Sequence, residues 1–276
     1  CVRLLGHAGS DLEATYKPLA DIEAAEALDP VLASARMLIE HHAATPGELL
    51  DIYEATRLRV RALAEDAVSR PKLTTRVEVM APLAPRDDVV IAAAASECAG
   101  AAARARFWDH KLPERARPAP LGSLLNSAIG DLLLQHPELL VFGEDVALKG
   151  GVYGVTRTLS RRARRGRVFD TLLDEQSILG LAIGAGQIGC LPLCEIQYLA
   201  YLHNAEDQLR GEAASLQFFS AGQYRNPMVV RVAAYAYQKG FGGHFHNDNS
   251  IAVLRDIPGI IIASPARGDD AVGMLR

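Results

Sequence analysis

A buried parallel strand is indicated by the stretch LLVFGEDV, residues 139–146. An uncharged apolar run comes first, and two carboxylates, Glu144 and Asp145, follow it directly. A short apolar run without alternating polar residues is typical of a strand that is covered on both faces of a sheet. The acidic residues would then lie at the carboxyl edge of that sheet, where ligands bind in open α/β folds.

Similar short runs recur further along the chain, and helix-forming segments lie between several of them. Strands are predicted over residues 168–171, 192–197, 228–232 and 259–263. Helices are predicted over residues 124–135, 177–188 and 205–219. This alternation is typical of βαβ units, so we expect an α/β fold whose parallel sheet is covered by helices on both faces.

The chain before residue 122 is expected to be mainly helical. A capping box at Thr45-Pro46-Gly47-Glu48 predicts one helix start, and the alanine-rich residues 87–107 predict another helix. Three prolines between residues 112 and 121 interrupt this pattern and predict a linker, where we place the main boundary. The resulting division is residues 1–80, a junction over 81–121 and a domain over 122–276.

The overall composition is that of an ordinary globular chain. Of its 276 residues, 49% are hydrophobic, and the formal net charge is −4. A pI near 6.1 argues against a basic nucleic-acid-binding protein. High hydrophobicity and low net charge exclude a chain that is disordered throughout. No apolar run approaches the ~20 residues of a membrane-spanning helix, so no membrane partner is expected.

The ends of the chain suggest a fragment of a longer polypeptide. It begins with Cys1 and stops at Arg276, inside a predicted helix, and no signal peptide is visible.

The four cysteines, at positions 1, 98, 190 and 194, do not form two pairs with zinc spacing. We therefore predict no metal site in these residues and expect buried free thiols in a reducing cytoplasm.

Four groups of polar residues fall near the predicted strand ends, where chemistry is expected. They are residues 143–146, residues 174–177, residues 195–198 with Tyr201 just beyond, and residues 240–248. The common phosphate-binding loop, the dinucleotide-binding fingerprint and the zinc-protease motif are all missing from the sequence.

Each candidate also has a purely structural interpretation. Glu175 could be a partner of a helix dipole, and Tyr201 could belong to the core. His244 and His246 flank an aromatic residue in a glycine-rich stretch and could serve that loop alone. The arginine-rich residues 161–167 could bind phosphate, but we favour a solvated surface for them.

Taken together, the motifs after residue 122 occur in a characteristic order. They are FGEDV (142–146), GGVY (150–153), RVFDT (167–171), DEQ (174–176), AIG (182–184), EIQ (195–197), DQ (207–208), EAA (212–214), GGHFH (242–246) and PG (258–259). This order resembles the β subunit of the thiamine-diphosphate-dependent 2-oxoacid dehydrogenases. Branched-chain 2-oxoacid enzymes are the most similar members. The resemblance implies the pyrimidine-binding fold of that family, preceded here by a helical segment.

The front of the chain resembles the end of the α subunit of the same enzymes. The residues that carry this are GHAGSD (6–11), Tyr16 and Asp29-Pro30. We therefore expect an α–β fusion that is trimmed at both ends, with the proline-rich stretch as the join. The family usually has a serine at position 8, where mammalian members are regulated by phosphorylation, and this chain has Ala8 instead.

The resemblance implies a cofactor site built from four side chains. Glu175 matches the glutamate that hydrogen-bonds a ring nitrogen of the aminopyrimidine and shifts the cofactor to its imino form. Tyr201 matches the aromatic residue that stacks on the same ring. Glu144 and Gln197, at the ends of two predicted strands, complete the implied cofactor-binding set.

The resemblance also implies two catalytic histidines and further components. His246 matches the β-subunit histidine that orients the lipoyl group or donates a proton in reductive acylation, and His7 matches the α-subunit histidine near the diphosphate. The family's diphosphate and Mg²⁺ motif is not found here, so we expect the Mg²⁺ ligands upstream of Cys1. The implied partners are a lipoyl-bearing acyltransferase and further copies of the chain, in an arrangement like α2β2.

Some positions depart from the family pattern. Asn247-Asp248-Asn249-Ser250-Ile251 stands where Ser-Gln-Ser-Pro-Glu is usual, and Asp174 stands where Ser or Cys is common. Residues 233–238 replace a loop that is usually richer in Pro and Gly. Oxidative decarboxylation of a branched-chain 2-oxoacid is the favoured function. The alternatives are a carbon–carbon transfer enzyme like transketolase or deoxyxylulose-phosphate synthase, and a non-catalytic assembly subunit.

Overall fold

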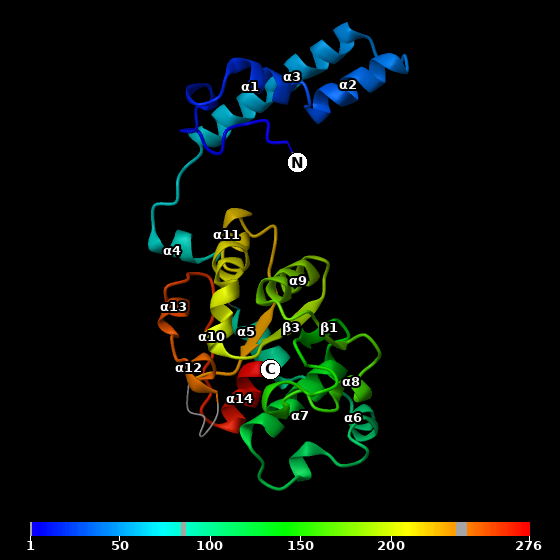
Figure 1. The fold of residues 1–276 in the computed structure, drawn as a ribbon. Helices are drawn as coiled ribbons and strands as arrows, with labels where there is room; N and C mark the ends of the chain where they lie inside the picture. Colours follow the sequence, from blue (N-terminus) through cyan, green and yellow to red (C-terminus); the bar gives the residue numbers. More distant parts are fainter. Residues whose placement is uncertain (1, 84–86, 236–241) are drawn as a thin grey trace. The chain divides into compact units, whose positions relative to one another are not determined.

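The computed structural model describes residues 2–83, 87–235 and 242–276 (Figure 1). Contacts within the chain divide it into two compact units, Cys1–Lys72 and Leu73–Arg276. The sheet belongs to the second unit. Parts of three predicted segments lie outside the described residues: residues 84–86 of the junction, 236–238 of the altered loop and 240–241 of the glycine-rich cluster.

The helices of the first unit confirm the predicted start signal. In α3 (Pro46–Ser69), the Glu48 amide donates to Thr45 Oγ1 at 3.3 Å, and the Thr45 amide donates to Glu48 Oε2 at 2.8 Å. The other helices are η1 (Glu13–Thr15), α1 (Leu19–Glu26) and α2 (Pro30–Glu40). No residue of α1, α2 or α3 is buried, so large apolar side chains such as Leu50 and Tyr53 stay exposed.

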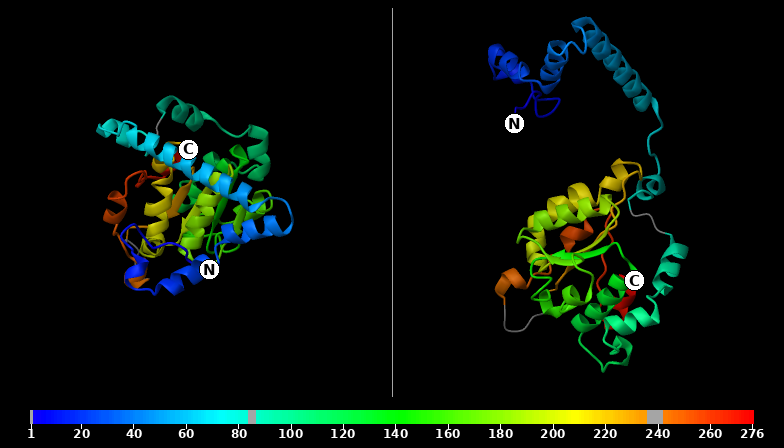
Figure 2. Two further views of the ribbon diagram at one scale, coloured as in Figure 1. Left: turned by 90° about the horizontal axis from the view of Figure 1, so that it is seen from above. Right: turned by 90° about the vertical axis from the view of Figure 1, so that its right-hand side faces the viewer.

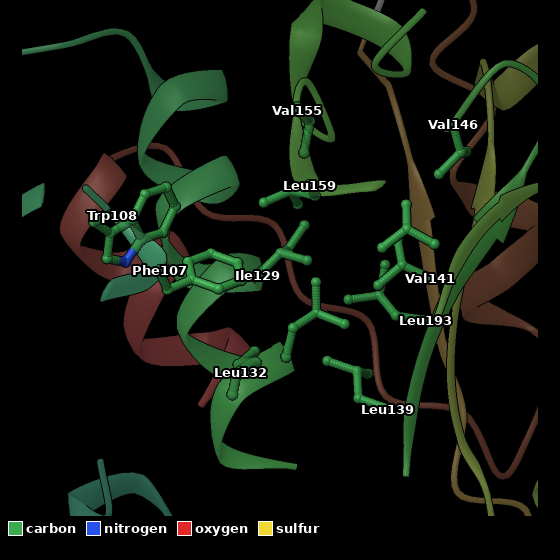
Figure 3. Close-up of a cluster of buried hydrophobic side chains, with 12 residues drawn as sticks. Phe107, Trp108, Ile129, Leu132, Leu139, Val141, Val146, Val155, Leu159 and Leu193 are labelled. Carbon is green, nitrogen blue, oxygen red and sulfur yellow. The ribbon is translucent and has the colours of Figure 1, made fainter. Parts of the chain in front are cut away.

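A helical segment precedes the sheet within the second unit. Its helices are α4 (Arg76–Met80), α5 (Asp88–Ser96), α6 (Ala101–Phe107) and η2 (Pro113–Arg115). The single helix predicted over 87–107 is therefore two helices, because the backbone turns extended at Glu97. Phe107 and Trp108, at the end of α6, are buried beside Ile129 of α7 (Leu121–Gln135) (Figure 3).

Gly130 of α7 makes this packing possible. A Cβ atom at that position would lie 2.5 Å from Trp108 Cζ2, which is closer than real carbon contacts. The indole Nε1 donates to Asp131 Oδ1 at 2.9 Å, and Arg104 Nε donates to the same oxygen at 3.0 Å. These contacts join residues 104–108 to α7 across residues 112–121. The compact units divide after Lys72, and the domain boundary in residues 112–121 stays a prediction. The join of α-like and β-like regions stays a prediction.

A four-stranded parallel sheet forms the centre of the second unit. Its strands are β1 (Leu139–Gly143), β2 (Val168–Asp170), β3 (Leu191–Ile196) and β4 (Val229–Val232), in the order β2-β1-β3-β4. The structure thus confirms the α/β fold class and four of the five predicted strands. The fifth predicted strand, over 259–263, is irregular backbone in the structure.

Side chains of β1 alternate between two hydrophobic clusters, one on each face of the sheet. Val141 belongs to the cluster with Ile129 of α7, whereas its neighbour Phe142 belongs to the cluster with Leu179 of α9 (Glu175–Gln187). Figure 3 shows the first cluster, in which Ile129 lies between the aromatic pair and Val141. The sheet is thus covered on both faces, as predicted (Figure 2).

The rest of the second unit consists of short helical pieces. They are η3 (Val152–Gly154), α8 (Leu159–Arg162), α10 (Leu199–Leu202), η4 (His203–Ala205), the π-helical η5 (Gln208–Ala213), α11 (Leu216–Phe219), α12 (Gly243–His246), α13 (Ala252–Arg255) and α14 (Gly268–Leu275). The helix predicted over 205–219 is therefore interrupted by a π-helical turn, a feature that is frequent at functional sites. Among the described residues, no helix is both long enough and apolar enough to cross a membrane.

The structure shows the surroundings of two cysteines and of Arg167, the last residue of the arginine-rich stretch 161–167. Cys194 is buried in β3, and burial raises the pKa of its thiol to about 12, so the thiol stays protonated. Cys98 is exposed, so the expectation of buried thiols fails at that position. Arg167 donates to the carbonyl oxygens of Leu139 and Leu133, at 2.8 and 2.9 Å, and thereby ties the end of α7 to the sheet.

Candidate active site

Three strands end together at one edge of the sheet. In the parallel register Gly143 of β1 lies opposite Asp170 of β2 and opposite Glu195 of β3. Glu144 and Gln197 follow two of these strands directly, and both are half-buried. The structure therefore brings these two predicted residues to the same edge, where side chains from neighbouring strands can act on one ligand.

Glu175 is the first residue of α9, and its position is set by a helix cap. Asp174 caps the helix, accepting from the Ser177 amide at 3.3 Å and also from the Ser177 hydroxyl. Asp174 stands where Ser or Cys is common in the family, and aspartate is one of the preferred residues for this capping position. The Glu175 side chain is half-buried and accepts a hydrogen bond from Asn204 Nδ2 at 3.3 Å.

Glu144 and Glu175 act on each other electrostatically. Burial raises the pKa of Glu144, and the negative charges of Asp145 and Glu175 raise it further. Two carboxylates that share a region of low solvation disfavour simultaneous ionisation, so one of them binds a proton more readily. The resemblance implies the proton-exchanging role for Glu175, whose charge is one of the causes of the raised pKa of Glu144.

Tyr201 and His246 lie in direct contact. The Tyr201 hydroxyl is 3.1 Å from His246 Nε2, and His246 Nδ1 is 2.8 Å from the Gly242 carbonyl oxygen. A carbonyl oxygen can only accept, so Nδ1 carries a proton, and in the neutral ring Nε2 accepts from the tyrosine hydroxyl. The ring of Tyr198 packs edge-on against the imidazole, with centroids 4.7 Å apart.

One short segment connects the two pairs of candidates. The α10–η4 segment, residues 199–205, carries Tyr201, which bonds His246, and Asn204, which bonds Glu175. Both pairs thus lie along the same part of the chain, immediately after β3. The structure brings Glu144, Glu175, Tyr201 and His246 into one region, with Gln197 at the same sheet edge.

His7 belongs to the first unit, and its position relative to the other candidates is not determined. Its side chain is exposed, and its backbone amide donates to Asp11 Oδ2 at 2.6 Å. The Tyr16 hydroxyl donates to the other oxygen of Asp11 at 2.9 Å. The hydrogen bonds from His7 and then Tyr16 hold the pKa of Asp11 below its usual value, so Asp11 orders the loop as a carboxylate.

Glu195 is a buried carboxylate that the sequence-based site did not include. Its side chain has no exposed surface, and it accepts from the Val152 amide at 2.9 Å and from Arg231 Nε at 3.0 Å. Arg231 Nη2 contacts the same oxygen as Nε. The EIQ motif contained this residue, but nothing in the sequence paired it with an arginine of a neighbouring strand.

Glu195 holds a tight turn beside the candidate site. Gly151 has a left-handed φ of 66°, and a Cβ there would lie 2.8 Å from Thr156 Oγ1 and 2.9 Å from Glu195 Oε2. The next residues, Val152 and Tyr153, therefore follow a backbone path that Glu195 fixes. Tyr153 is also left-handed, with φ 57°, and such non-glycine conformations concentrate at functional sites.

Tyr153, in this turn, interacts with the side chain of Tyr198. Burial raises the pKa of Tyr198, and Tyr153, which shares a hydrogen bond with Tyr198, raises it further. The buried pair of Glu195 and Arg231 is thus connected through Tyr153 and Tyr198 to His246. Tyr153 and Tyr198 therefore border the candidate site next to the end of β3.

The described ranges contain no group of three or more His, Cys, Asp or Glu side chains that could hold a metal ion.

Residues 118–276 match the family model described as transketolase, pyrimidine binding domain. The chain belongs to this family. The match begins close to the predicted domain start at residue 122, and it covers every candidate of the second unit.

Curated relatives support the same conclusion over this region. The chain is 36% identical over 151 residues to 2-oxoisovalerate dehydrogenase subunit beta of Pseudomonas aeruginosa, covering 55% of this chain and 43% of the relative. It is 36% identical over 156 residues to pyruvate dehydrogenase E1 component subunit beta of Staphylococcus epidermidis, covering 55% and 46%. It is 36% identical over 162 residues to 2-oxoisovalerate dehydrogenase subunit beta 2 of Arabidopsis thaliana, a mitochondrial protein, covering 59% and 45%.

The predicted resemblance to a component of the thiamine-diphosphate-dependent 2-oxoacid dehydrogenases is confirmed by these matches. The chain spans less than half the length of the curated relatives that it matches. The α-like character of the front segment and the fusion stay predictions, since the matched family region begins at residue 118.

Proposed function

We propose that the full protein is the decarboxylating component of a 2-oxoacid dehydrogenase complex, with a branched-chain 2-oxoacid as its substrate. The observation that carries the proposal is the half-buried Glu175 at the start of α9, next to Glu144 and near Tyr201. The sequence relatives over this region include β subunits named for 2-oxoisovalerate and for pyruvate, so they support the enzyme class more firmly than the acyl chain.

The residues present fit the aminopyrimidine half of thiamine diphosphate. A half-buried carboxylate is available for the ring nitrogen, and a tyrosine ring lies on the same α10–η4 segment that bonds this carboxylate. Glu144 and Gln197, at the carboxyl edge, would add polar contacts. When bound, the cofactor supplies a nucleophilic carbanion that can add to the 2-oxo group and stabilise the acyl carbanion left by decarboxylation.

Glu175 would exchange a proton with the ring nitrogen of the aminopyrimidine. The Glu175 carboxylate, which accepts a hydrogen bond from Asn204, would be the group that bonds this nitrogen. Tyr201 would orient the ring by contact with its face, while its hydroxyl keeps the Nε2 atom of His246 in place.

His246 would serve the second half of the reaction, the reductive acylation of a lipoyl group. Its Nδ1 proton is held by the Gly242 carbonyl, so the Nε2 atom is the one available for proton transfer once the tyrosine hydroxyl moves aside. His7 would act from the α-like region, near the cofactor diphosphate. The partner is proposed to be a lipoyl-bearing acyltransferase, and the location the cytoplasm.

Assembly with further subunits is part of the proposal. Leu181 of α9 and Ile188, which directly follows this helix, are exposed, and a Cβ atom at Gly180 or Gly184 would meet nothing within 4 Å among the described residues. This apolar, smooth helix surface supports contact with another subunit at the side of α9. Mg²⁺ would be held by residues outside the described ranges.

The experiment is a decarboxylation assay of the full-length protein with thiamine diphosphate and Mg²⁺, comparing 2-oxoisovalerate with pyruvate. We expect turnover of both, with the higher kcat/KM for 2-oxoisovalerate. A higher value for pyruvate would replace the proposed substrate and keep the enzyme class. Ketol transfer between sugar phosphates would favour a transketolase-like enzyme. Absence of both turnover and cofactor binding would favour a non-catalytic assembly subunit.

A further inference from the structure

The segment that follows His246 is the part of the site where this chain departs most from its family. Asn247, Asp248 and Asn249 stand where a sequence with Ser, Gln and Ser is usual, and Ile251 replaces an acidic residue. This departure motivated the alternative of a non-catalytic subunit. The structure shows what the new residues contact.

Asp248 is held on both of its carboxylate oxygens. Its Oδ2 atom is 3.0 Å from His203 Nε2, and its Oδ1 atom accepts from the Ser250 amide at 2.9 Å. The Ser250 hydroxyl bonds Oδ1 as well. These hydrogen bonds, from Ser250 and then from His203, hold the pKa of Asp248 below its usual value, so the side chain is an anion.

His203 lies between two carboxylates. Its Nε2 atom contacts Asp248, and its Nδ1 atom is 3.8 Å from Glu206 Oε2. The Asp248 side chain is only 18% exposed and that of His203 is 38% exposed, so solvent screens this pair less than a fully exposed one. His203 is also the neighbour of Asn204, which bonds Glu175.

Two contacts of the same kind thus join the α10–η4 segment to the His246 segment. Tyr201 bonds His246, and two residues further along both segments His203 bonds Asp248. A single hydrogen bond lets a loop rotate about the contact, whereas two contacts at different points fix its orientation. The second contact therefore restrains the chain two residues beyond His246.

We propose that His203 and Asp248 form a positioning pair that fixes the His246 segment on the α10–η4 segment, taking the place of the loop sequence usual in the family. Neither residue needs to touch substrate or cofactor. The pair orients His246 for the lipoyl-transfer step, and to that extent the inference rests on the proposed function.

The first experiment measures the pair without any assay of activity. Hydrogen exchange of the backbone amides in residues 242–250 is compared among full-length wild type, His203→Ala, Asp248→Ala and the double variant. Each single variant is expected to exchange about two- to fivefold faster, because a pair of this kind contributes a modest free energy. The double variant is expected to exchange no faster than Asp248→Ala, which already loses the contact with His203 together with the hydrogen bonds from Ser250.

Controls separate this effect from a general loss of order. Arg255→Ala removes an exposed ion pair with Asp256 in α13, and it should leave exchange in residues 242–250 unchanged. Unchanged exchange in both single variants, or additive effects in the double variant, would overturn the proposal.

The second experiment links the pair to the reaction. Decarboxylation is measured with an artificial electron acceptor, and reductive acylation is measured with a lipoyl domain. The single variants should lose about two- to fivefold in lipoyl acylation while decarboxylation changes less. A change in exchange with no turnover in any protein would refute the proposed function alone. Turnover of the wild type with no response of exchange would refute the positioning pair alone.

Discussion

Two glutamates at the same sheet edge, Glu195 and Glu175, have opposite surroundings. Glu195 is fully buried and bound by Arg231 and by the Val152 amide, so its charge is neutralised inside the protein. Glu175 is half-buried beside another carboxylate, and it accepts a hydrogen bond from the side-chain amide of Asn204. A neutralised carboxylate holds structure, whereas one without a cationic partner can exchange protons with a ligand. Residue type alone does not distinguish the two.

The largest effect is expected for Glu175→Gln. The amide cannot take up or release a proton, and loss of such a group costs about 10²–10⁴-fold in rate. We expect 2-oxoacid turnover to fall by this amount, with the melting temperature and assembly state unchanged. Steady-state kinetics and calorimetry measure the two quantities. Turnover near that of the wild type would show that Glu175 is not the proton partner of the cofactor.

Glu195→Ala should mainly lower the free energy of unfolding. It leaves the guanidinium of Arg231, only 12% exposed, without its anion, and removing one member of a buried pair costs about 3–5 kcal/mol. Urea unfolding measures the loss. The double variant Glu195→Leu, Arg231→Met should recover most of it, because no buried charge remains. If the single variant unfolds like the wild type, Glu195 is not the structural carboxylate of this edge.

Gly151→Ala tests the turn that Glu195 holds. The new Cβ would enter a left-handed conformation and would also approach the Glu195 carboxylate and Thr156, so a loss of about 1–3 kcal/mol is expected. Gly166→Ala is the matched control: its φ is 84°, but a Cβ there meets nothing within 4 Å. The control should lose less in chemical unfolding. Equal losses would mean that backbone conformation alone requires Gly151.

The smallest effect is expected for Glu144→Gln, and it depends on pH. The pKa of Glu144 is raised in the folded protein, so the folded state binds this proton more tightly than the unfolded state. Ionising Glu144 therefore costs stability as pH rises above the usual value of 4.5. The variant lacks this cost and should melt higher at pH 7, by less than about 3 °C, and match the wild type below pH 4.5. A melting temperature that falls at pH 7 would contradict the assignment.

Most of the sheet could be predicted from the sequence because the strands are short apolar runs at regular spacing. The residues around Val141 and Leu193 require burial on both faces, and this requirement is local to each strand. The run over 259–263 has the same composition but no neighbour to pair with, since strand pairing is a property of the whole sheet. The π-helical turn at 208–213 was likewise not predictable from helical periodicity.

The candidate site was likewise only partly predictable from the sequence. The order of motifs after residue 122 pointed to Glu175, Tyr201 and His246, and the family match over residues 118–276 supports that order. The motifs did not indicate the bond between Tyr201 and His246, the pair of His203 and Asp248, or the pair of Glu195 and Arg231. Each of these contacts joins residues 36 to 45 positions apart.

The sequence alone was sufficient for the fold class, for four of the five predicted strands and for a set of candidate site residues, because these follow from local apolar runs and from the order of motifs. Which carboxylate is neutralised and which stays open to a ligand became clear only in the folded chain. The physical reason is that burial and the approach of a counter-charge arise where separate strands and helices meet. Glu175 and Glu195 are the same side chain in two such environments.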